Sequence, residues 1–208
     1  DPLAIALVVA ANMAFAQIKK SKHDMTKEYF EYWKVNNVVS PEDCKKLISL
    51  GDERWNSAVV GYKEDDTNEN KTIRESEVVW VRDTNWKDFF WKFMHHMNTE
   101  SGLNFQIDGV DHLQLTKYVA PSGHYDYHID GNGYTEGNSK VRKISMTCLL
   151  NDDFEGGDFN FRISKEYTVS MKQGDVIFFP SYFPHKVTPV TKGTRYSLVA
   201  WFVGNPLT

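Results

Sequence analysis

From residue 109 onward the chain alternates short apolar runs with turn-forming residues, and this pattern constrains the fold more than any other feature. It predicts strands near 111–119, 125–130, 143–150, 158–163, 167–170, 174–179, 184–190 and 195–203. Clusters such as Pro121-Ser122-Gly123 and Lys192-Gly193 separate the runs. Many short strands at this spacing favour a mostly β fold, namely a double-sheet jelly roll.

The first part of the chain is predicted to carry helices. Ser40-Pro41 is followed by acidic residues, a typical helix start, and the helix is expected to continue to Trp55. A second, aromatic-rich helix is expected from Asn85 to Met97, and strands are expected over 31–39 and 76–82. Because the helices precede most strands, they are expected to pack on the outside of the sandwich.

The N-terminal segment has a different character. Residues 2–16 are almost wholly apolar, but the run is shorter than the roughly 20 residues that a membrane span requires. Three interpretations stay open: a helix packed on the domain or on a partner chain, a targeting remnant, or a membrane-seeking segment. We therefore divide the chain into residues 1–28, an apolar helix and linker, and residues 29–208, the main domain.

Charge and cysteine content narrow the function classes. The net charge is −4, which disfavours a broad nucleic-acid-binding surface. The two cysteines, Cys44 and Cys148, form no CxxC motif, so a soluble protein of the reducing cytoplasm is expected.

Two residues near the end of one predicted strand have the spacing of metal ligands. His128 and Asp130 are two positions apart, so on a strand they project from the same face. His185, 57 residues downstream, follows another apolar run and is the natural third ligand. Two histidines and one carboxylate with open positions are typical of non-haem Fe(II) oxygenases.

The spacing leaves a second register open. His124 and Asp126 form the same HxD pattern, and on a regular strand positions 124, 126, 128 and 130 would all share one face. The glycines after Asp130 put the 128/130 pair at a strand end, where loops form a mouth, which favours that pair. A lone HxD is more often without function, and His185 alone is more often a turn histidine. We interpret the remaining histidines as packing or surface residues: His23, His95, His96 and His112.

A basic residue lies ten positions beyond His185. Arg195 belongs to an otherwise apolar strand, where a charged side chain requires a partner. Ser197 lies on the same face, and the guanidinium fork suits a carboxylate. The pair therefore describes a site for a small dicarboxylic acid, and an internal ion pair to Asp or Glu is the alternative.

Taken together, these segments resemble a known family. The segments LQLTKYVAPSGHYDYHID, LLNDDFEGGDFNF and GDVIFFPSYFPHKVTPVTKGTRYSLVAWFVG occur in the order and spacing of the prolyl 4-hydroxylase-like Fe(II)/2-oxoglutarate dioxygenases, and the resemblance runs from about Glu31 to Gly204. It implies a double-stranded β-helix with flanking N-terminal helices, and it selects the 128/130 register.

The resemblance also implies roles for individual residues. His128, Asp130 and His185 would bind iron, and Arg195 would pair with the distal carboxylate of 2-oxoglutarate. Many prolyl hydroxylases have Lys at that position, so Arg is similar to the bacterial subgroup. Further contacts to 2-oxoglutarate would come from Tyr118, which is one residue out of the family frame, and from Ser197 and Thr147. The implied cofactors are Fe(II), 2-oxoglutarate and O2, with ascorbate as a further candidate.

The implied activity is hydroxylation of a prolyl or other amino-acid residue in a peptide or protein. Tyr127, Trp80 and Tyr134 are candidates for lining a peptide groove, and the loops 62–72 and 131–142 are candidates for a lid. Two alternatives stay open. One is an oxygenase for nucleic-acid bases, although the Arg-x5-Arg signature of that branch is absent. The other is a non-catalytic jelly-roll binding or structural module.

Overall fold

The computed structural model describes residues 32–51, 54–58, 72–111, 113–131 and 140–206. The apolar segment 2–16, the linker, His23, His112 and Tyr134 lie outside these residues, as do most of the two predicted lid loops. The expectations for them stay predictions.

The larger of two main sheets forms the middle of the molecule. Its strands follow the order β1-β12-β8-β15-β6-β4-β2, and β5 pairs with the far end of β15. All pairings are antiparallel. The bounds are β1 (Trp33–Val35), β2 (Asn56–Ser57), β4 (Glu77–Val81), β5 (Gly109–Val110), β6 (Leu113–Val119), β8 (Val141–Leu149), β12 (Val176–Pro180) and β15 (Thr194–Gly204).

The smaller sheet lies opposite, with the order β11-β10-β13-β7-β3. Its strands are β3 (Arg74–Glu75), β7 (His124–His128), β10 (Phe159–Arg162), β11 (Glu166–Val169) and β13 (His185–Val187). A short ribbon of β9 (Glu155–Gly156) and β14 (Val190–Lys192) joins the two sheets at one end. Two facing antiparallel sheets are the jelly-roll architecture that the strand spacing predicts.

Two helices begin at the side-chain caps that their sequences offer. In α2 (Pro41–Ser49) the Ser40 hydroxyl accepts from the Asp43 backbone N–H at 3.1 Å. In α4 (Thr84–Glu100) the Asp83 carboxylate accepts from the Trp86 N–H at 3.1 Å. Each contact satisfies an otherwise unpaired amide of the first turn. Among the described residues, no helix is long and apolar enough to cross a membrane.

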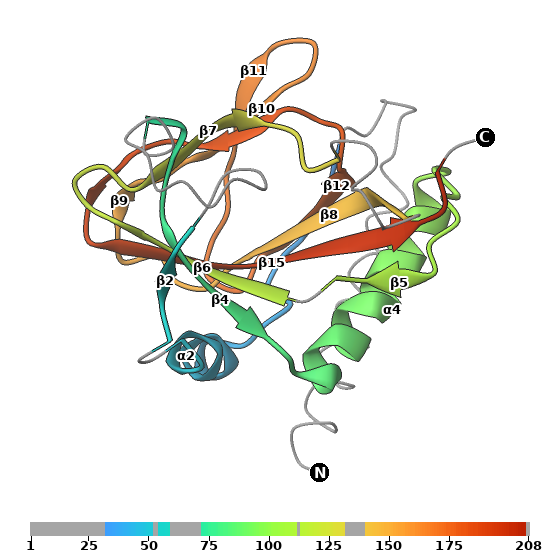
Figure 1. Cartoon of the computed structure of the whole chain (residues 1–208), viewed down its shortest axis with the longest axis horizontal. Coiled ribbons are helices and arrows are strands. Elements are labelled where there is room, and N and C mark those ends of the chain that lie inside the picture. Colours follow the sequence, from blue (N-terminus) through green and yellow to red (C-terminus); the bar gives the residue numbers. More distant parts are fainter. Residues whose placement is uncertain (1–31, 52–53, 59–71, 112, 132–139, 207–208) are drawn as a thin grey trace.

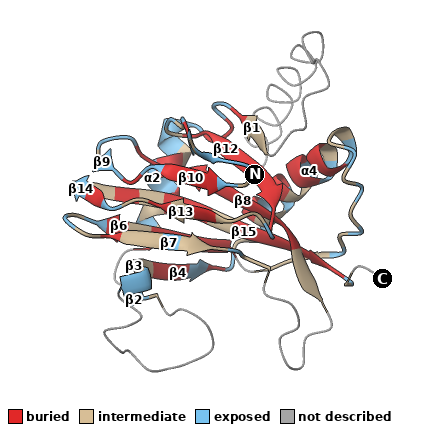
Figure 2. Ribbon diagram, turned by 90° about the horizontal axis from the view of Figure 1, so that it is seen from above, coloured by how far each residue is buried: buried red, intermediate tan, exposed pale blue. Residues whose placement is uncertain are grey.

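The elements form three layers (Figure 1). Both helices lie on one side of the larger sheet, and the smaller sheet lies on its other side. A core of buried side chains, including Leu47, Phe93 and Phe202, fills the space between helices and sheet. Figure 2 shows that burial is greatest along β8, β12, β15 and α4, whereas β7 is only half-buried. The face of the larger sheet toward the smaller sheet is therefore less completely covered than the face toward the helices.

Several element boundaries differ from the predictions. The strand expected over 31–39 is only three residues long, because Asn37 has a positive φ of 53° and its N–H bonds to Asp175. The first helix ends at Ser49 and not at Trp55, because the Trp55 ring packs directly on Gly51, where a Cβ would clash. The run 184–190 divides into β13 and β14 around Pro189, which has no N–H to donate.

Candidate metal and cosubstrate site

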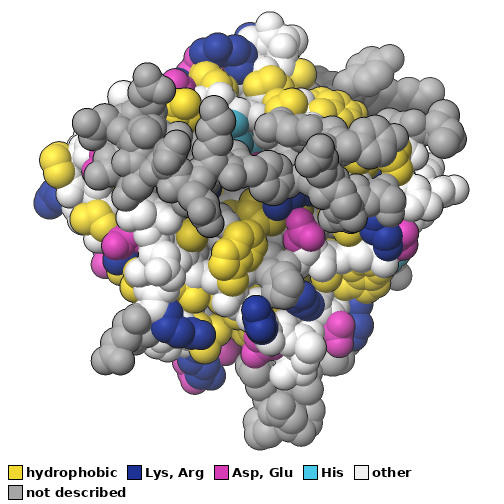
Figure 3. Space-filling view, in the orientation of Figure 1, with side chains coloured by type: hydrophobic (Ala, Val, Ile, Leu, Met, Phe, Trp, Pro, Cys, Tyr) yellow, Lys and Arg dark blue, Asp and Glu magenta, His cyan; other side chains and the backbone are white. Residues whose placement is uncertain are grey.

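A cavity of about 420 Å³ opens between the two sheets. Its floor comes from the larger sheet, and its opposite wall comes from β7, β10 and β13 of the smaller sheet. Figure 3 shows the face of the molecule that is seen in Figure 1, with apolar side chains near its centre and basic and acidic side chains around them. Its volume lies in the range of small-molecule sites in proteins.

Strand alternation puts the predicted cosubstrate residues on the cavity floor. Arg195 pairs with Tyr118 across β15 and β6, and Ser197 pairs with Thr116. Side chains two positions apart share a face, so these four residues point into the cavity, while Tyr196, between Arg195 and Ser197 on β15, packs against the core between the sheet and the helices. Thr147 on β8 lines the same cavity. The predicted positions therefore converge on one site.

The three predicted metal ligands also converge. His128 Nε2 lies 3.5 Å from Asp130 Oδ1, and His185 Nε2 lies 3.6 Å from Asp130 Oδ2. The ligand atoms of the three residues all lie within 4.8 Å of one another, and no other such group of three occurs among the described residues. Two imidazoles and one carboxylate are the donor set of non-haem Fe(II) sites, so the residues fit that metal.

Hydrogen bonds fix both imidazole rings for metal binding. His128 Nδ1 lies 2.8 Å from the Asp126 carbonyl oxygen, and His185 Nδ1 lies 2.9 Å from the Phe183 carbonyl oxygen. A carbonyl oxygen only accepts, so each Nδ1 carries the proton and each Nε2 presents a lone pair. Burial, with a smaller contribution from His128, lowers the pKa of His185 to about 4, although Asp130 opposes the shift. His185 is therefore neutral at pH 7, as a metal ligand must be.

The carboxylate ligand is held from behind by two buried serines. Ser145 Oγ donates to Asp130 Oδ2 at 2.6 Å and lies 2.9 Å from Ser181 Oγ. The backbone N–H of Asp130 donates to the Ser181 carbonyl oxygen at 2.8 Å. Burial alone would raise the pKa of Asp130, but the two histidines and Ser145 outweigh it and hold the pKa well below its ordinary value. Neither serine was among the predicted site residues, although Ser145 stands two residues before Thr147 on β8.

A β-bulge decides which histidine of β7 reaches the cavity. His128 pairs with His185, and Tyr125 pairs with Val187, so Asp126 and Tyr127 together oppose one residue of β13. The extra residue places Tyr125 and His128 on the same side of the strand. The expectation that positions 124, 126, 128 and 130 all share one face is therefore wrong. Asp130 lies beyond the strand end and reaches the cluster from a bend.

His124 and Tyr127 consequently lie away from the metal cluster. The His124 ring is within 2.8 Å of the Ser122 carbonyl oxygen and 3.1 Å of that of Thr72, at the edge of the sheet. Tyr127 lies on the outer face between Arg162 and Lys186, whose cations are 3.7 and 4.6 Å from its ring centre. Tyr127 does not line the cavity, so its predicted place in a groove is wrong. His95 and His96 lie on α4, away from the cavity, as expected.

Arg195 is buried without a carboxylate partner. It is 2% exposed, and its Nε and Nη1 atoms have no hydrogen-bond acceptor among the residues that the structure describes. No ion pair to a described acidic residue includes it, so the internal ion pair considered as an alternative is not found. Burial lowers the pKa of Arg195, but a guanidinium stays charged in proteins. A buried cation with free donors fits an anionic ligand from outside the chain.

The opposite side of the cavity contains an aromatic column that the sequence analysis did not identify. The Tyr125 ring stacks on the His128 ring with 3.4 Å between centres. Arg74 Cζ lies 4.5 Å above the other face of Tyr125. Burial raises the pKa of Tyr125 to about 12, although Arg74 opposes the shift. Arg74 belongs to a two-residue strand after a polar segment, so no periodicity signals it.

Comparisons with known proteins agree with this geometry. Residues 113–203 match the 2OG-Fe(II) oxygenase superfamily. A PKHD-type hydroxylase of Synechococcus sp. (strain CC9311) is 37% identical over 93 residues, which are 43% of this chain and 41% of that protein. One from Idiomarina loihiensis is 41% identical over 61 residues, 28% of each. The chain thus spans less than half the length of these relatives.

Solved structures show the same fold. A prolyl hydroxylase from Trichoplax adhaerens, in complex with a peptide fragment of a hypoxia inducible factor oxygen degradation domain, superposes with a TM-score of 0.67. It is 18% identical, over 92% of this chain and 88% of that one. A Pseudomonas putida prolyl-4-hydroxylase gives a TM-score of 0.63 at 19% identity, over 83% of this chain and 91% of that one. The predicted jelly roll is confirmed, and the segment 113–203, less than half of the chain, is similar to the 2OG-Fe(II) oxygenase superfamily.

Proposed function

We propose that this chain is an Fe(II)- and 2-oxoglutarate-dependent dioxygenase that hydroxylates a prolyl or other amino-acid residue of a peptide or protein. One observation carries the proposal: His128, Asp130 and His185 form the wall of the same cavity whose floor holds the unpaired Arg195. A metal site and a carboxylate site in one cavity are what this chemistry requires.

Each residue has a distinct role in this proposal. His128, Asp130 and His185 would hold the iron, and Arg195 would bind the distal carboxylate of 2-oxoglutarate. Tyr118 and Ser197, on the same floor, would add hydroxyl donors, and Thr147 would line the pocket. When bound, iron and 2-oxoglutarate supply the activation of O2 that oxidises a substrate C–H bond. The chain orients both and limits the access of water from the core side of the cavity.

A peptide substrate is supported by the open side of the cavity and by the relatives. Trp80, which is 48% exposed, lines the cavity beside the buried Trp201, with 6.1 Å between the ring centres. Aromatic side chains with one face in solvent suit an extended peptide, since they supply contact area without large ordering costs. The Trichoplax neighbour is in complex with a peptide fragment, which favours the same substrate class here.

Succinate release from 2-oxoglutarate tests the proposal. The protein is reconstituted anaerobically with Fe(II) and then exposed to O2, with and without prolyl peptides. His128→Ala should lose at least about a hundredfold of the activity, because a metal ligand is removed. His124→Ala is the matched control, because it changes the same residue type on the same strand outside the metal cluster. Loss of activity only in His124→Ala, or wild-type protein that binds neither metal nor 2-oxoglutarate, would contradict the proposal. The second result would favour a non-catalytic binding module.

A further inference from the structure

The cavity contains a second arginine that the proposed roles do not use. Arg74 lies on β3 and reaches the cavity from the side of the smaller sheet. Its Nε donates to Ser76 Oγ at 2.8 Å, and its Nη2 donates to Gln114 Oε1 at 3.2 Å. Both acceptors are neutral, and no ion pair links Arg74 to an acidic side chain of the described residues. Within the described part of the chain, the positive charge is therefore oriented by neutral groups and has no acidic partner.

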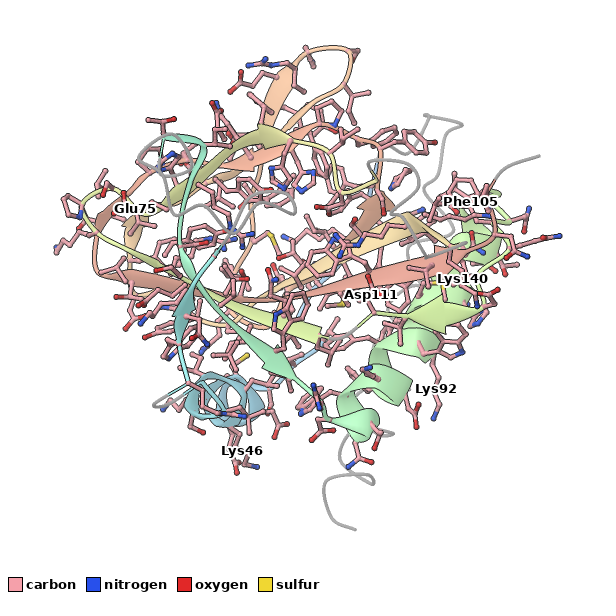
Figure 4. The ribbon with its side chains drawn as sticks, in the orientation of Figure 1. Lys46, Glu75, Lys92, Phe105, Asp111 and Lys140 are labelled. Carbon is pink, nitrogen blue, oxygen red and sulfur yellow. The ribbon has the colours of Figure 1, made fainter. Side chains whose placement is uncertain are left out.

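The other cations at the cavity mouth do have acidic partners. Lys140 Nζ lies 2.8 Å from Asp108 Oδ1, and Arg142 Nε lies 3.1 Å from Asp111 Oδ2. Figure 4 shows the labelled Lys140 and Asp111 toward the β5 end of the larger sheet, far from Glu75, the neighbour of Arg74 on β3. Arg74 thus differs from Lys140 and Arg142, because no acidic side chain of the described residues pairs with it.

The position of Arg74 separates it from the predicted cosubstrate site. Its partner Gln114 lies four residues before Tyr118 on β6, about 13 Å along the strand. Arg195 pairs with Tyr118, so the two guanidinium groups are anchored at different ends of the cavity floor. One small dicarboxylic acid bound to Arg195 therefore leaves Arg74 available for another ligand.

The position also places Arg74 close to the metal cluster. Its Cζ lies 4.5 Å from the centre of the Tyr125 ring, and that ring lies 3.4 Å from the ring of His128. Arg74 has five N–H donors, and bonds to described residues use two of them, on Nε and Nη2, so Nη1 keeps donors for a ligand. A group bound there lies within about three residues of an extended peptide from the residue at the metal.

We propose that Arg74 binds a carboxylate of the primary substrate, so that the favoured substrate is a peptide with an acidic group within about three residues of the hydroxylated one. This inference rests on the proposed function. The carboxylate comes from an Asp or Glu side chain or from the C-terminus of the peptide, since both present the same two oxygens to the guanidinium. The neutral partners Ser76 and Gln114 hold the fork without competing for its charge.

The test compares peptides that differ only in charge. The probes are blocked peptides of one proline flanked by three alanines on each side, with Asp in place of each alanine in turn, and the same series with Asn. A shorter peptide with a free or amidated C-terminus distinguishes the second source of the carboxylate. Binding to the Fe(II)- and 2-oxoglutarate-loaded protein is measured anaerobically by calorimetry, and succinate release is measured separately after addition of O2.

At one or more positions the wild type should bind the Asp peptide about tenfold more tightly than the Asn peptide, because a charge-assisted pair replaces a neutral one. Arg74→Gln should remove this preference, Arg74→Lys should retain part of it, and Arg74→Glu should shift it to peptides with Lys at the same position. Arg82→Gln is the matched control, because Arg82 is exposed just after β4 and does not line the cavity. It should retain the wild-type preference.

Four results would overturn the inference. They are equal binding of Asp and Asn peptides by the wild type, no binding of any peptide, an unchanged preference in Arg74→Gln, or weaker binding of 2-oxoglutarate itself in Arg74→Gln. The proposed function fails separately: a charge preference in binding without succinate release would keep the Arg74 site and contradict the hydroxylase. Thermal unfolding of each variant shows that it is folded.

Discussion

The two ends of the cavity each contain an arginine, but the protein holds these two side chains in different ways. Arg195 is 2% exposed, with two nitrogen atoms that lack acceptors. Arg74 is half-buried, bound by Ser76 and Gln114, and stacked on Tyr125. A buried, unpaired cation is destabilising until an anion joins it, whereas a partly solvated one costs little. The buried end of the cavity, at Arg195, therefore suits a ligand that is needed in every catalytic cycle. The more exposed end, at Arg74, suits a ligand that the protein selects by its charge.

The largest effect is expected from replacing Arg195. Arg195→Met should weaken 2-oxoglutarate binding about a hundredfold or more, because the buried partner of a carboxylate is lost. The ligand-free variant should nevertheless be more stable than the wild type by about 1–4 kcal/mol, because an uncompensated buried charge is removed. Thermal unfolding with and without 2-oxoglutarate measures both effects.

The control for this pair of measurements is Arg82→Met, since Arg82 is exposed just after β4 and does not line the cavity. It should change neither the stability of the ligand-free protein nor its response to 2-oxoglutarate. An Arg195→Met protein that is less stable than the wild type without ligand would break the comparison, because it would mean that Arg195 is already compensated.

Removal of a hydroxyl behind the metal cluster should have the next largest effect. Ser145→Ala removes the hydrogen bond to Asp130 Oδ2 and should lower the affinity for Mn(II), a stand-in for iron, by about ten- to a hundredfold. Calorimetric titration measures the affinity, and the exposed Ser170→Ala provides the control. Equal affinities in all three proteins would show that the carboxylate needs no support from Ser145.

A smaller effect is expected at the mouth of the cavity. Trp80→Ala should raise the KM for a prolyl peptide several-fold and leave the affinity for 2-oxoglutarate unchanged, because Trp80 is far more exposed than the floor residues. The unfolding free energy should fall by about 1–2 kcal/mol, because roughly half of Trp80 is buried, in part beside Trp201. Steady-state kinetics at saturating 2-oxoglutarate give the KM. A drop in 2-oxoglutarate affinity would show that the two ends are not independent.

The smallest effect concerns the titration of Tyr125. Burial raises its pKa to about 12 in the folded protein, above the ordinary value of 10. Its contribution to stability is therefore complete below pH 10 and is lost as the pH rises toward 12. Tyr125→Phe should lack this loss, so its stability should fall less than that of the wild type between pH 9 and 11. Ultraviolet titration of folded and urea-unfolded protein measures the tyrosinate. Ionisation of Tyr125 near pH 10 in the folded protein would exclude strong burial.

The start of the first helix and the jelly-roll class were accessible to sequence reasoning because they depend on local chemistry. Ser40 accepts from the amide three residues ahead, an interaction that short-range sequence encodes. Asp83 makes the same contact at the start of α4, although that helix was expected to begin at Asn85 and its cap was not predicted. Short-range sequence also encodes the apolar alternation of β15, which put Arg195 and Ser197 on one face. Helix and strand ends were predicted less well, since Asn37, Gly51 and Pro189 act through tertiary neighbours or backbone constraints.

The sequence by itself determined the fold class, the set of candidate ligands and the cavity side of the long strands, because periodicity and ligand spacing are properties of neighbouring residues. Only the tertiary structure decided which histidine of β7 reaches the cluster, because the bulge opposite Lys186 changes the alternation after Tyr125. It alone placed Ser145 behind Asp130 and Arg74 above Tyr125, since these contacts join segments far apart in the chain. Long-range contacts depend on how sheets pack, and no local pattern records them.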